Sequence, residues 1–148
     1  MAWARLAVSG DLEPLLELLP HANPDMPVLP WERSREIWAR TLAREGLYVF
    51  VSDAGEQIVA SCLLVTAPNL MRGGRQHAFI ENVVTHAEYR RRGHGRAVIE
   101  AALETAWAED CHHVLLQSGR KDPGVHAFYE TCGFVPGVRT AYVARRPG

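Results

Sequence analysis

The chain has no long apolar run and few cysteines, and each of these absences excludes a class of protein. No apolar stretch approaches the roughly 18 residues that a membrane-spanning helix requires. The 3 cysteines, Cys62, Cys111 and Cys132, share no spacing typical of a disulfide framework or of a zinc site. We therefore expect no membrane association, no bound metal and a reducing, cytoplasmic location.

Excess charge and repetition are also missing. The 148 residues carry 16 basic and 17 acidic side chains, a formal net charge of −1, and these charges are spread along the chain. This balance argues against a nucleic-acid-binding protein, which needs a basic face to neutralise phosphates. The sequence contains no internal repeat or low-complexity tract, and its length suits a single domain over residues 1–148.

Hydrophobic patterns and turn residues predict a mixed α/β fold, one sheet with helices on both faces, in the order βααβββαβαβ. Asp11 is expected to cap the first helix, and Trp31 and Trp38 to share the apolar stripe of the second. Two long loops, 21–30 and 66–77, are candidate binding loops. The expected strands cover residues 3–8, 47–52, 57–65, 78–85, 113–118 and 138–144, and the expected helices cover 12–19, 31–45, 97–109 and 123–132.

The most informative segment joins the strand at 78–85 to the helix at 97–109, and it combines arginines with glycines. A glycine-rich turn from a strand into a helix leaves backbone N–H groups unpaired where the helix dipole favours an anion. The arginines add charge and donors, and the glycines lack side chains that would hold a phosphate away from the backbone. The segment therefore predicts a pyrophosphate site. Its residues are Tyr89, Arg90, Arg91, Arg92, Gly93, His94, Gly95 and Arg96.

The common nucleotide-binding motifs do not fit this segment. A P-loop needs a Lys-Ser/Thr pair after a longer glycine frame, and a dinucleotide-binding turn needs glycine or alanine where Val98 stands. The remaining alternative from the residues alone is an arginine patch that is solvated or faces a nucleic acid.

Two motifs resemble the GNAT superfamily of N-acetyltransferases. Arg90, Gly93 and Gly95 match in register its coenzyme A signature, Arg/Gln-x-x-Gly-x-Gly/Ala, and residues 128–134 resemble its Phe-Tyr-Glu-x-x-Gly-Phe segment. The resemblance covers residues 77–134 closely. It implies the acetyltransferase fold, in which central parallel strands, here 78–85 and 113–118, splay apart to admit the pantetheine arm of acetyl-CoA. Residues 79–84 and 132–134 also resemble the glucosamine-phosphate acetyltransferase branch, which commonly has aspartate where Asn82 stands.

The resemblance implies roles for the coenzyme-binding residues. The N–H groups of residues 91–96 would bind the pyrophosphate of acetyl-CoA, with His94 contributing its backbone, and the main chain at Val83 and Val84 would pair with pantetheine. Phe128 would contact the coenzyme. Asp122 stands where the family usually has asparagine; it can cap the following helix, but its charge puts the usual coenzyme contact in doubt.

The resemblance also implies direct acetyl transfer to a primary amine in a ternary complex. Tyr129 would be the general acid for the leaving thiolate, the alternative being a packed tyrosine bonded to backbone. Glu81 would be the base, the alternative being a structural carboxylate. Arg72 and Asn82 are candidate acceptor contacts.

The acceptor itself stays open. A small-molecule amine is favoured over a protein, and a homodimer is left open. The rival to an enzyme is a non-catalytic acyl-CoA-binding sensor or interaction module, which would not need Tyr129 or Glu81.

Overall fold

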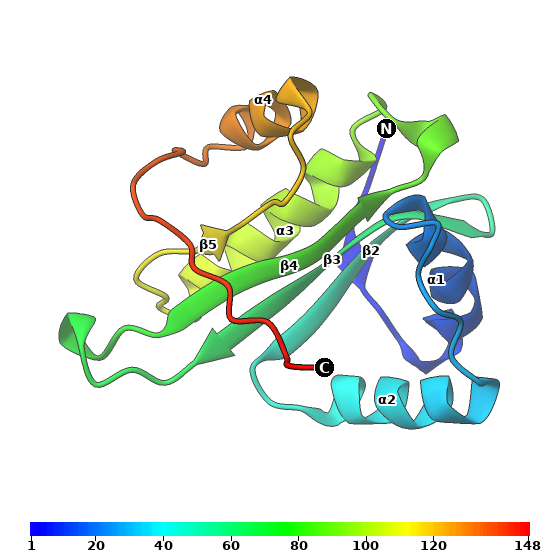
Figure 1. The fold of residues 1–148 in the computed structure, drawn as a ribbon, viewed down its shortest axis with the longest axis horizontal. Helices are drawn as coiled ribbons and strands as arrows, with labels where there is room; N and C mark the ends of the chain where they lie inside the picture. The colour runs from blue at the N-terminus through cyan, green and yellow to red at the C-terminus, as the bar shows by residue number, and fades with distance from the viewer. The chain divides into compact units, whose positions relative to one another are not determined.

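The computed structural model describes residues 1–148, which divide into two compact units, Met1–Leu116 and Gln117–Gly148. The first unit contains a five-stranded mixed sheet with the order β1-β2-β3-β4-β5 (Figure 1). Its neighbours pair antiparallel except β4 and β5, which are parallel. The strands are β1 (Arg5–Leu6), β2 (Leu47–Ala54), β3 (Gln57–Ala67), β4 (His77–Thr85) and β5 (Leu115–Leu116).

Helices cover both faces of this sheet, as the sequence predicts. On one face, α1 (Leu12–Leu18) and α2 (Trp31–Ala43) contribute their buried leucines and Trp38 to a cluster that includes Val51 and Val84. On the other face lies α3 (His94–Ala108), in which Val98, Ile99, Ala102 and Ala106 are fully buried. The Cys62 thiol of β3 donates to the Val98 carbonyl at 3.4 Å, which identifies the face of the sheet that meets α3.

Short 3-10 turns connect these elements, and the second unit contains one helix. The turns are Ser9–Asp11, Leu19–His21, Arg72–Gly74 and Ala87–Tyr89, and the helix is α4 (Pro123–Thr131). Proline at the first position of α4 has no N–H to leave unpaired, so it is well placed there.

Several local predictions were wrong. Residues 138–144 form no strand, because a strand exists only where a partner supplies its hydrogen bonds, and a local pattern cannot reveal a partner. Trp31 is exposed and only Trp38 is buried. Helix α3 begins at His94, three residues before the expected start, because Gly93 takes a left-handed φ of 88° and ends the turn there.

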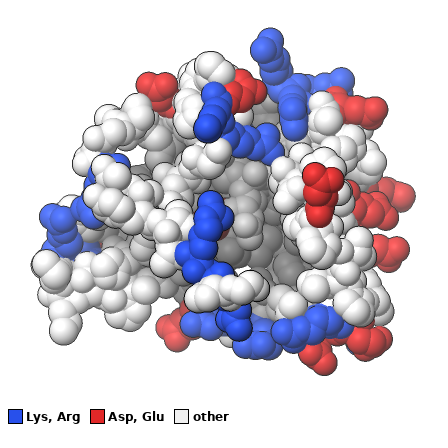
Figure 2. Space-filling model, in the orientation of Figure 1, with Lys and Arg blue, Asp and Glu red and all other residues white.

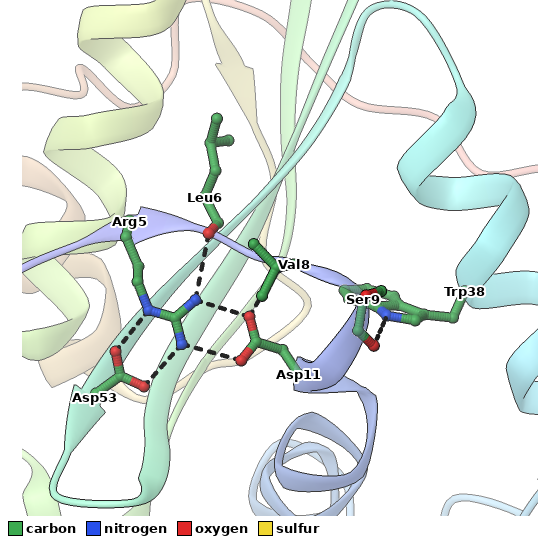
Figure 3. Close-up of polar contacts among 7 residues, drawn as sticks. All are labelled: Arg5, Leu6, Val8, Ser9, Asp11, Trp38 and Asp53. Carbon is green, nitrogen blue, oxygen red and sulfur yellow. Dashed lines mark hydrogen bonds and ion pairs between the residues drawn. The ribbon is translucent and has the colours of Figure 1, made fainter.

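Asp11 does not cap α1 with its side chain (Figure 3). Its carboxylate instead accepts two hydrogen bonds from the Arg5 guanidinium, at 2.7 and 3.0 Å, and one from the Val8 N–H. Arg5 also donates to both oxygens of Asp53. The ion pair with Arg5 holds the pKa of the buried Asp11 carboxyl below its usual value. This cluster ties β1 to the start of α1 and to β2.

The C-terminal end of α3 is held by a second polar cluster around Glu109. The Tyr48 hydroxyl donates to Glu109 Oε1, the Thr66 hydroxyl to Oε2 at 3.4 Å, and Gln76 Nε2 to the Glu109 carbonyl at 2.9 Å. The bond to Glu109, together with burial, raises the pKa of Tyr48 to about 12. Strands β2 and β3 and the residue that precedes β4 are thereby joined to one helix end.

Candidate coenzyme and acetyl-transfer site

Strand β4 extends well beyond its parallel pairing with β5. The pairing of β4 with β5 consists of Phe79 with Leu115 and Ile80 with Leu116, whereas β4 continues to Thr85. Beyond Ile80 the main chain of β4, including Val83 and Val84, has no strand partner on the β5 side. Unpaired backbone groups at a strand edge can hydrogen-bond an extended ligand that carries amides. The pairing ends within the segments where the resemblance implies a splay.

A β-bulge lies in β4 at the same point. The register with β3 shifts between Ser61 and Leu63, and Asn82 takes a left-handed φ of 52°. Left-handed backbone disfavours most side chains but is tolerated by asparagine, so the lone Asn within this strand was a signal for the bulge. The bulge exposes Asn82 to solvent.

Glu81 immediately precedes this bulge and faces the α1 and α2 side of the sheet. It pairs with Leu63, one position from Leu64 and Ile80, whose side chains belong to the α3 face with Cys62. Alternation along a strand therefore places Glu81 on the opposite face. The side chain is half-buried. A carboxylate thus stands where β4 loses its parallel partner.

The predicted pyrophosphate loop lies where β4 leads into α3. Arg90, Arg91 and Arg92 are exposed and form no ion pair, while Arg96 pairs with Glu100 at 3.3 Å. Gly93 occupies the N-cap position, after which the N–H groups of the first helical turn have no acceptor within the helix. Donors and positive charge are concentrated here, and Arg90, Arg91 and Arg92 have no balancing carboxylate. These residues fit a pyrophosphate.

The sequence predicts that His94 contributes only its backbone, but its side chain also has a structural role. Its imidazole is buried, and Nδ1 lies 2.8 Å from the Ser52 hydroxyl of β2. Burial lowers the pKa of His94, and the positive charges of the chain's N-terminus and of Arg92 lower it further. A neutral imidazole therefore ties the start of α3 to the sheet directly behind the loop.

Helix α4 presents the second motif within the second unit. The Asp122 carboxylate accepts from the Gly124 N–H at 2.8 Å, which confirms the expected cap. Tyr129 is half-buried, and its ring packs edge-on against Phe134 with centroids 6.3 Å apart and beside Phe128 at 5.4 Å. The Tyr129 carbonyl accepts from Phe134 N–H at 3.2 Å, which closes the helix end.

Two regions of the first unit are candidates for binding the acetyl acceptor: the pocket between α1 and α2 and the β3–β4 loop. They differ in charge. Between α1 and α2 lies a pocket of about 440 Å³ lined by Glu13, Leu16, Glu17 and Trp31. Acidic side chains gather on this side of the molecule, at the right in Figure 2. The β3–β4 loop instead carries arginines. Arg75 pairs with Asp110 at 3.3 Å, whereas the exposed Arg72 has no carboxylate partner.

Comparisons with known proteins agree with this geometry. Residues 12–134 match the model of the acetyltransferase (GNAT) family. The chain is 34% identical over 130 residues to a glucosamine 6-phosphate N-acetyltransferase from Trypanosoma brucei brucei, covering 88% of this chain and 86% of that protein. The chain belongs to the GNAT family. Glucosamine 6-phosphate N-acetyltransferase 1 from Oryza sativa subsp. japonica is 31% identical over 123 residues, or 81% of this chain and 72% of that protein.

A solved acetyltransferase structure has the same architecture as this chain. It is a presumed acetyltransferase from Agrobacterium tumefaciens str. C58, with 45% identity, a TM-score of 0.91 and coverage of 97% of this chain and 99% of that one. The protein is thus an N-acetyltransferase of a family that uses acetyl-CoA, as the two motifs predict. No helix is long and apolar enough to cross a membrane, and no three His, Cys, Asp or Glu side chains are grouped to bind a metal.

Proposed function

We propose that this GNAT enzyme transfers an acetyl group from acetyl-CoA to the primary amine of a small amino-sugar phosphate, such as glucosamine 6-phosphate. The observation that carries the proposal is the 34% identical Trypanosoma relative, which acetylates that compound by name and matches most of both chains. The unpaired edge of β4, the bulge at Asn82 and the exposed arginine loop supply the surfaces that such a reaction needs.

The coenzyme is proposed to bind along the end of β4 and the start of α3. The main chain of Val83 and Val84 would hydrogen-bond the pantetheine amides, and residues 91–96 would hold the pyrophosphate. Phe128 would contact the coenzyme from α4. Asp122 is a cap in the second unit, so a role in coenzyme binding would come through the position of α4. Bound acetyl-CoA supplies an activated acetyl thioester.

Transfer is proposed to be direct, within a ternary complex. The neutral amine forms the new C–N bond at the thioester carbonyl, Glu81 accepts the amine proton, the C–S bond breaks, and Tyr129 donates a proton to the thiolate. Tyr129→Phe keeps the ring and removes that proton. Turnover is expected to fall by about 10² to 10⁴ with coenzyme affinity unchanged. Turnover within a few-fold of the parent would make Tyr129 a packing residue only.

Glu81→Gln tests the base separately. Glutamine is nearly the same size but cannot accept the proton, so turnover should fall at neutral pH and recover as pH rises and the amine deprotonates unaided. An unchanged pH profile would assign Glu81 a structural role.

The acceptor is identified by following thiol release from acetyl-CoA with glucosamine 6-phosphate, glucosamine and an aminoglycoside as substrates. The proposal expects the phosphorylated amino sugar to have the highest kcat/KM, because an arginine can bind its phosphate. Equal kcat/KM values for glucosamine and glucosamine 6-phosphate would show that the enzyme does not recognise the phosphate. Binding of acetyl-CoA without release on any amine would favour the alternative, a non-catalytic acyl-CoA-binding module.

We propose a cytoplasmic enzyme that acts on a small molecule, with no nucleic acid or membrane partner, and whose two units belong to one acetyltransferase domain over residues 1–148. A homodimer is compatible with this reading, and sedimentation of the purified chain would decide its oligomeric state.

A further inference from the structure

Two histidines hold the turn that precedes the pyrophosphate loop. This turn, Ala87–Tyr89, follows β4 and ends where Arg90 begins the loop. His86 Nδ1 accepts the N–H of Glu88 at 3.1 Å, and His21 Nδ1 accepts the N–H of Ala87 at 3.3 Å. His21 comes from the turn after α1, so the contact joins segments 66 positions apart in the sequence.

These histidines begin a row of rings in contact beside the loop. The imidazoles of His21 and His86 have centroids 3.9 Å apart, Tyr89 meets His86 edge-on at 5.3 Å, and His94 meets Tyr89 edge-on at 6.0 Å. The Arg92 guanidinium stands over the Tyr89 ring, 5.1 Å from its centroid. The row therefore connects the end of α1 with the start of α3 and supports one loop arginine.

The hydrogen bonds require both histidines to be neutral. An imidazole nitrogen can accept a hydrogen bond only when it carries no proton, and both nitrogens of a charged imidazole are donors. Burial, His86 and Arg90 lower the pKa of His21, and Glu88 acts in the opposite direction. His86 faces His21, Glu88 and Tyr89. Protonation of either imidazole turns its accepting nitrogen into a donor and removes a hydrogen bond that holds the turn, and protonation of both would add repulsion between the neighbouring rings.

We propose that His21 and His86 are positioning residues for coenzyme binding, which as neutral imidazoles fix the turn Ala87–Tyr89 and the loop that follows it. Protonation of either releases the turn and weakens binding. The inference rests on the proposed placement of the pyrophosphate at residues 91–96.

The test is calorimetric titration with dephospho-coenzyme A between pH 5.5 and 7.5. This probe keeps the pyrophosphate but lacks the 3′-phosphate, which itself titrates near pH 6. The affinity of the parent protein should fall by about 3- to 10-fold towards pH 5.5, the effect of losing one or two neutral hydrogen bonds.

Matched variants separate the acceptor from the ring. His86→Asn keeps a side-chain oxygen that can accept from the residue two positions on but cannot be protonated, so affinity at pH 7.5 should be retained and the pH dependence reduced. His86→Phe and His21→Phe keep a ring without an acceptor, so affinity should fall at every pH. His77→Asn, an exposed position at the other end of β4, should keep the parental profile.

The outcomes distinguish this inference from the proposed coenzyme site. Parental pH dependence in His86→Asn, together with parental affinity in both phenylalanine variants, overturns the role of the histidines. Undiminished binding by Gly95→Glu overturns the coenzyme site itself. Loss of binding in Gly95→Glu with unchanged behaviour of the histidine variants means that the site stands and only the histidine role fails.

Discussion

The two ends of helix α3 contrast sharply. At its N-terminal end, Gly93 caps the helix with a left-handed turn, and Arg90, Arg91 and Arg92 have no carboxylate partners. At its C-terminal end, Glu109 accepts hydrogen bonds from three side chains, one on β2, one on β3 and one just before β4, through both its side chain and its carbonyl. At the N-terminal end, hydrogen-bond donors have no protein acceptor. At the C-terminal end, the acceptors of Glu109 are bonded by donors from the protein.

The contrast separates residues that bind a ligand from residues that hold the fold. Donors without a partner slightly raise the free energy of the unliganded site and gain hydrogen bonds when an anion binds. Acceptors that already have protein donors stabilise the fold with or without a ligand. Substitutions of the exposed arginines at the N-terminal end should therefore change coenzyme affinity more than stability. Substitutions at the C-terminal end should do the reverse.

The largest expected effect is that of Gly95→Glu at the open end. A carboxylate within the first turn would both block and repel the pyrophosphate, so affinity for coenzyme A should fall by at least about 100-fold in calorimetry. Ala108→Glu is the charge control: it adds the same charge near the other end of α3, at an exposed position, whereas Gly95 is buried, so circular dichroism of both variants checks that they are folded. Equal affinities in the two variants would remove the distinction between the ends.

Tyr48→Phe probes the filled end. It deletes one hydrogen bond to a carboxylate, so the free energy of unfolding should drop by about 1–2 kcal/mol, measured in urea, with the KM for acetyl-CoA unchanged. The raised pKa of about 12 means that this stabilisation is complete below the unfolded value of 10.0 and is lost as pH rises through 12. Tyr142→Phe, at an exposed position, is the control. A raised KM in Tyr48→Phe would show that the two ends are coupled.

Arg72→Ala tests whether the β3–β4 loop supplies a donor that binds the acceptor phosphate. Losing one guanidinium–phosphate contact should raise the acceptor KM by about 3- to 10-fold and leave the KM for acetyl-CoA unchanged. Arg75→Ala, whose guanidinium is already paired with Asp110, should change neither constant. If both variants behave like the parent, the loop lies outside the acceptor site.

The smallest expected effect belongs to Glu100→Gln. Its pair with Arg96 spans one helical turn at an exposed surface, so stability should fall by about 0.3–0.5 kcal/mol at most. Coenzyme affinity should rise about twofold at low salt, because Arg96 no longer shares its charge with a carboxylate. A loss of affinity would mean that Glu100 positions Arg96 for the coenzyme.

Local patterns predicted the parts of the site that depend on local backbone geometry. Gly93 and Gly95 identified the strand-to-helix turn because a left-handed N-cap and close backbone approach require particular residues at particular positions. The sequence also predicts a β2–β3 hairpin with its turn at residues 53–55; the hairpin is present, but β2 continues through Ala54 and the turn lies at Gly55 and Glu56.

Partners distant in sequence could not be predicted in this way. The bond of His94 to Ser52 spans 42 positions, and the contact of His21 with the turn at Ala87 spans 66. Asp11 looked like a helix cap, but Arg5 offered its carboxylate a charged partner that outweighs a cap. The two outer strands lie within the expected ranges 3–8 and 113–118, but each is only two residues long, because the length of a strand depends on the partner that it pairs with.

The Arg5 cluster has a consequence for the order in which the chain folds. The meander β2–β3–β4 requires only local turns, whereas joining Arg5 to Asp53 closes a loop of 48 positions that contains both α1 and α2. Loop closure of this length costs about 3 kcal/mol beyond its constant contribution. We therefore expect the meander to form first and β1 to dock late, so Arg5→Ala should accelerate unfolding in stopped-flow experiments and leave the folding rate nearly unchanged. A slower folding rate would place this guanidinium in the folding nucleus.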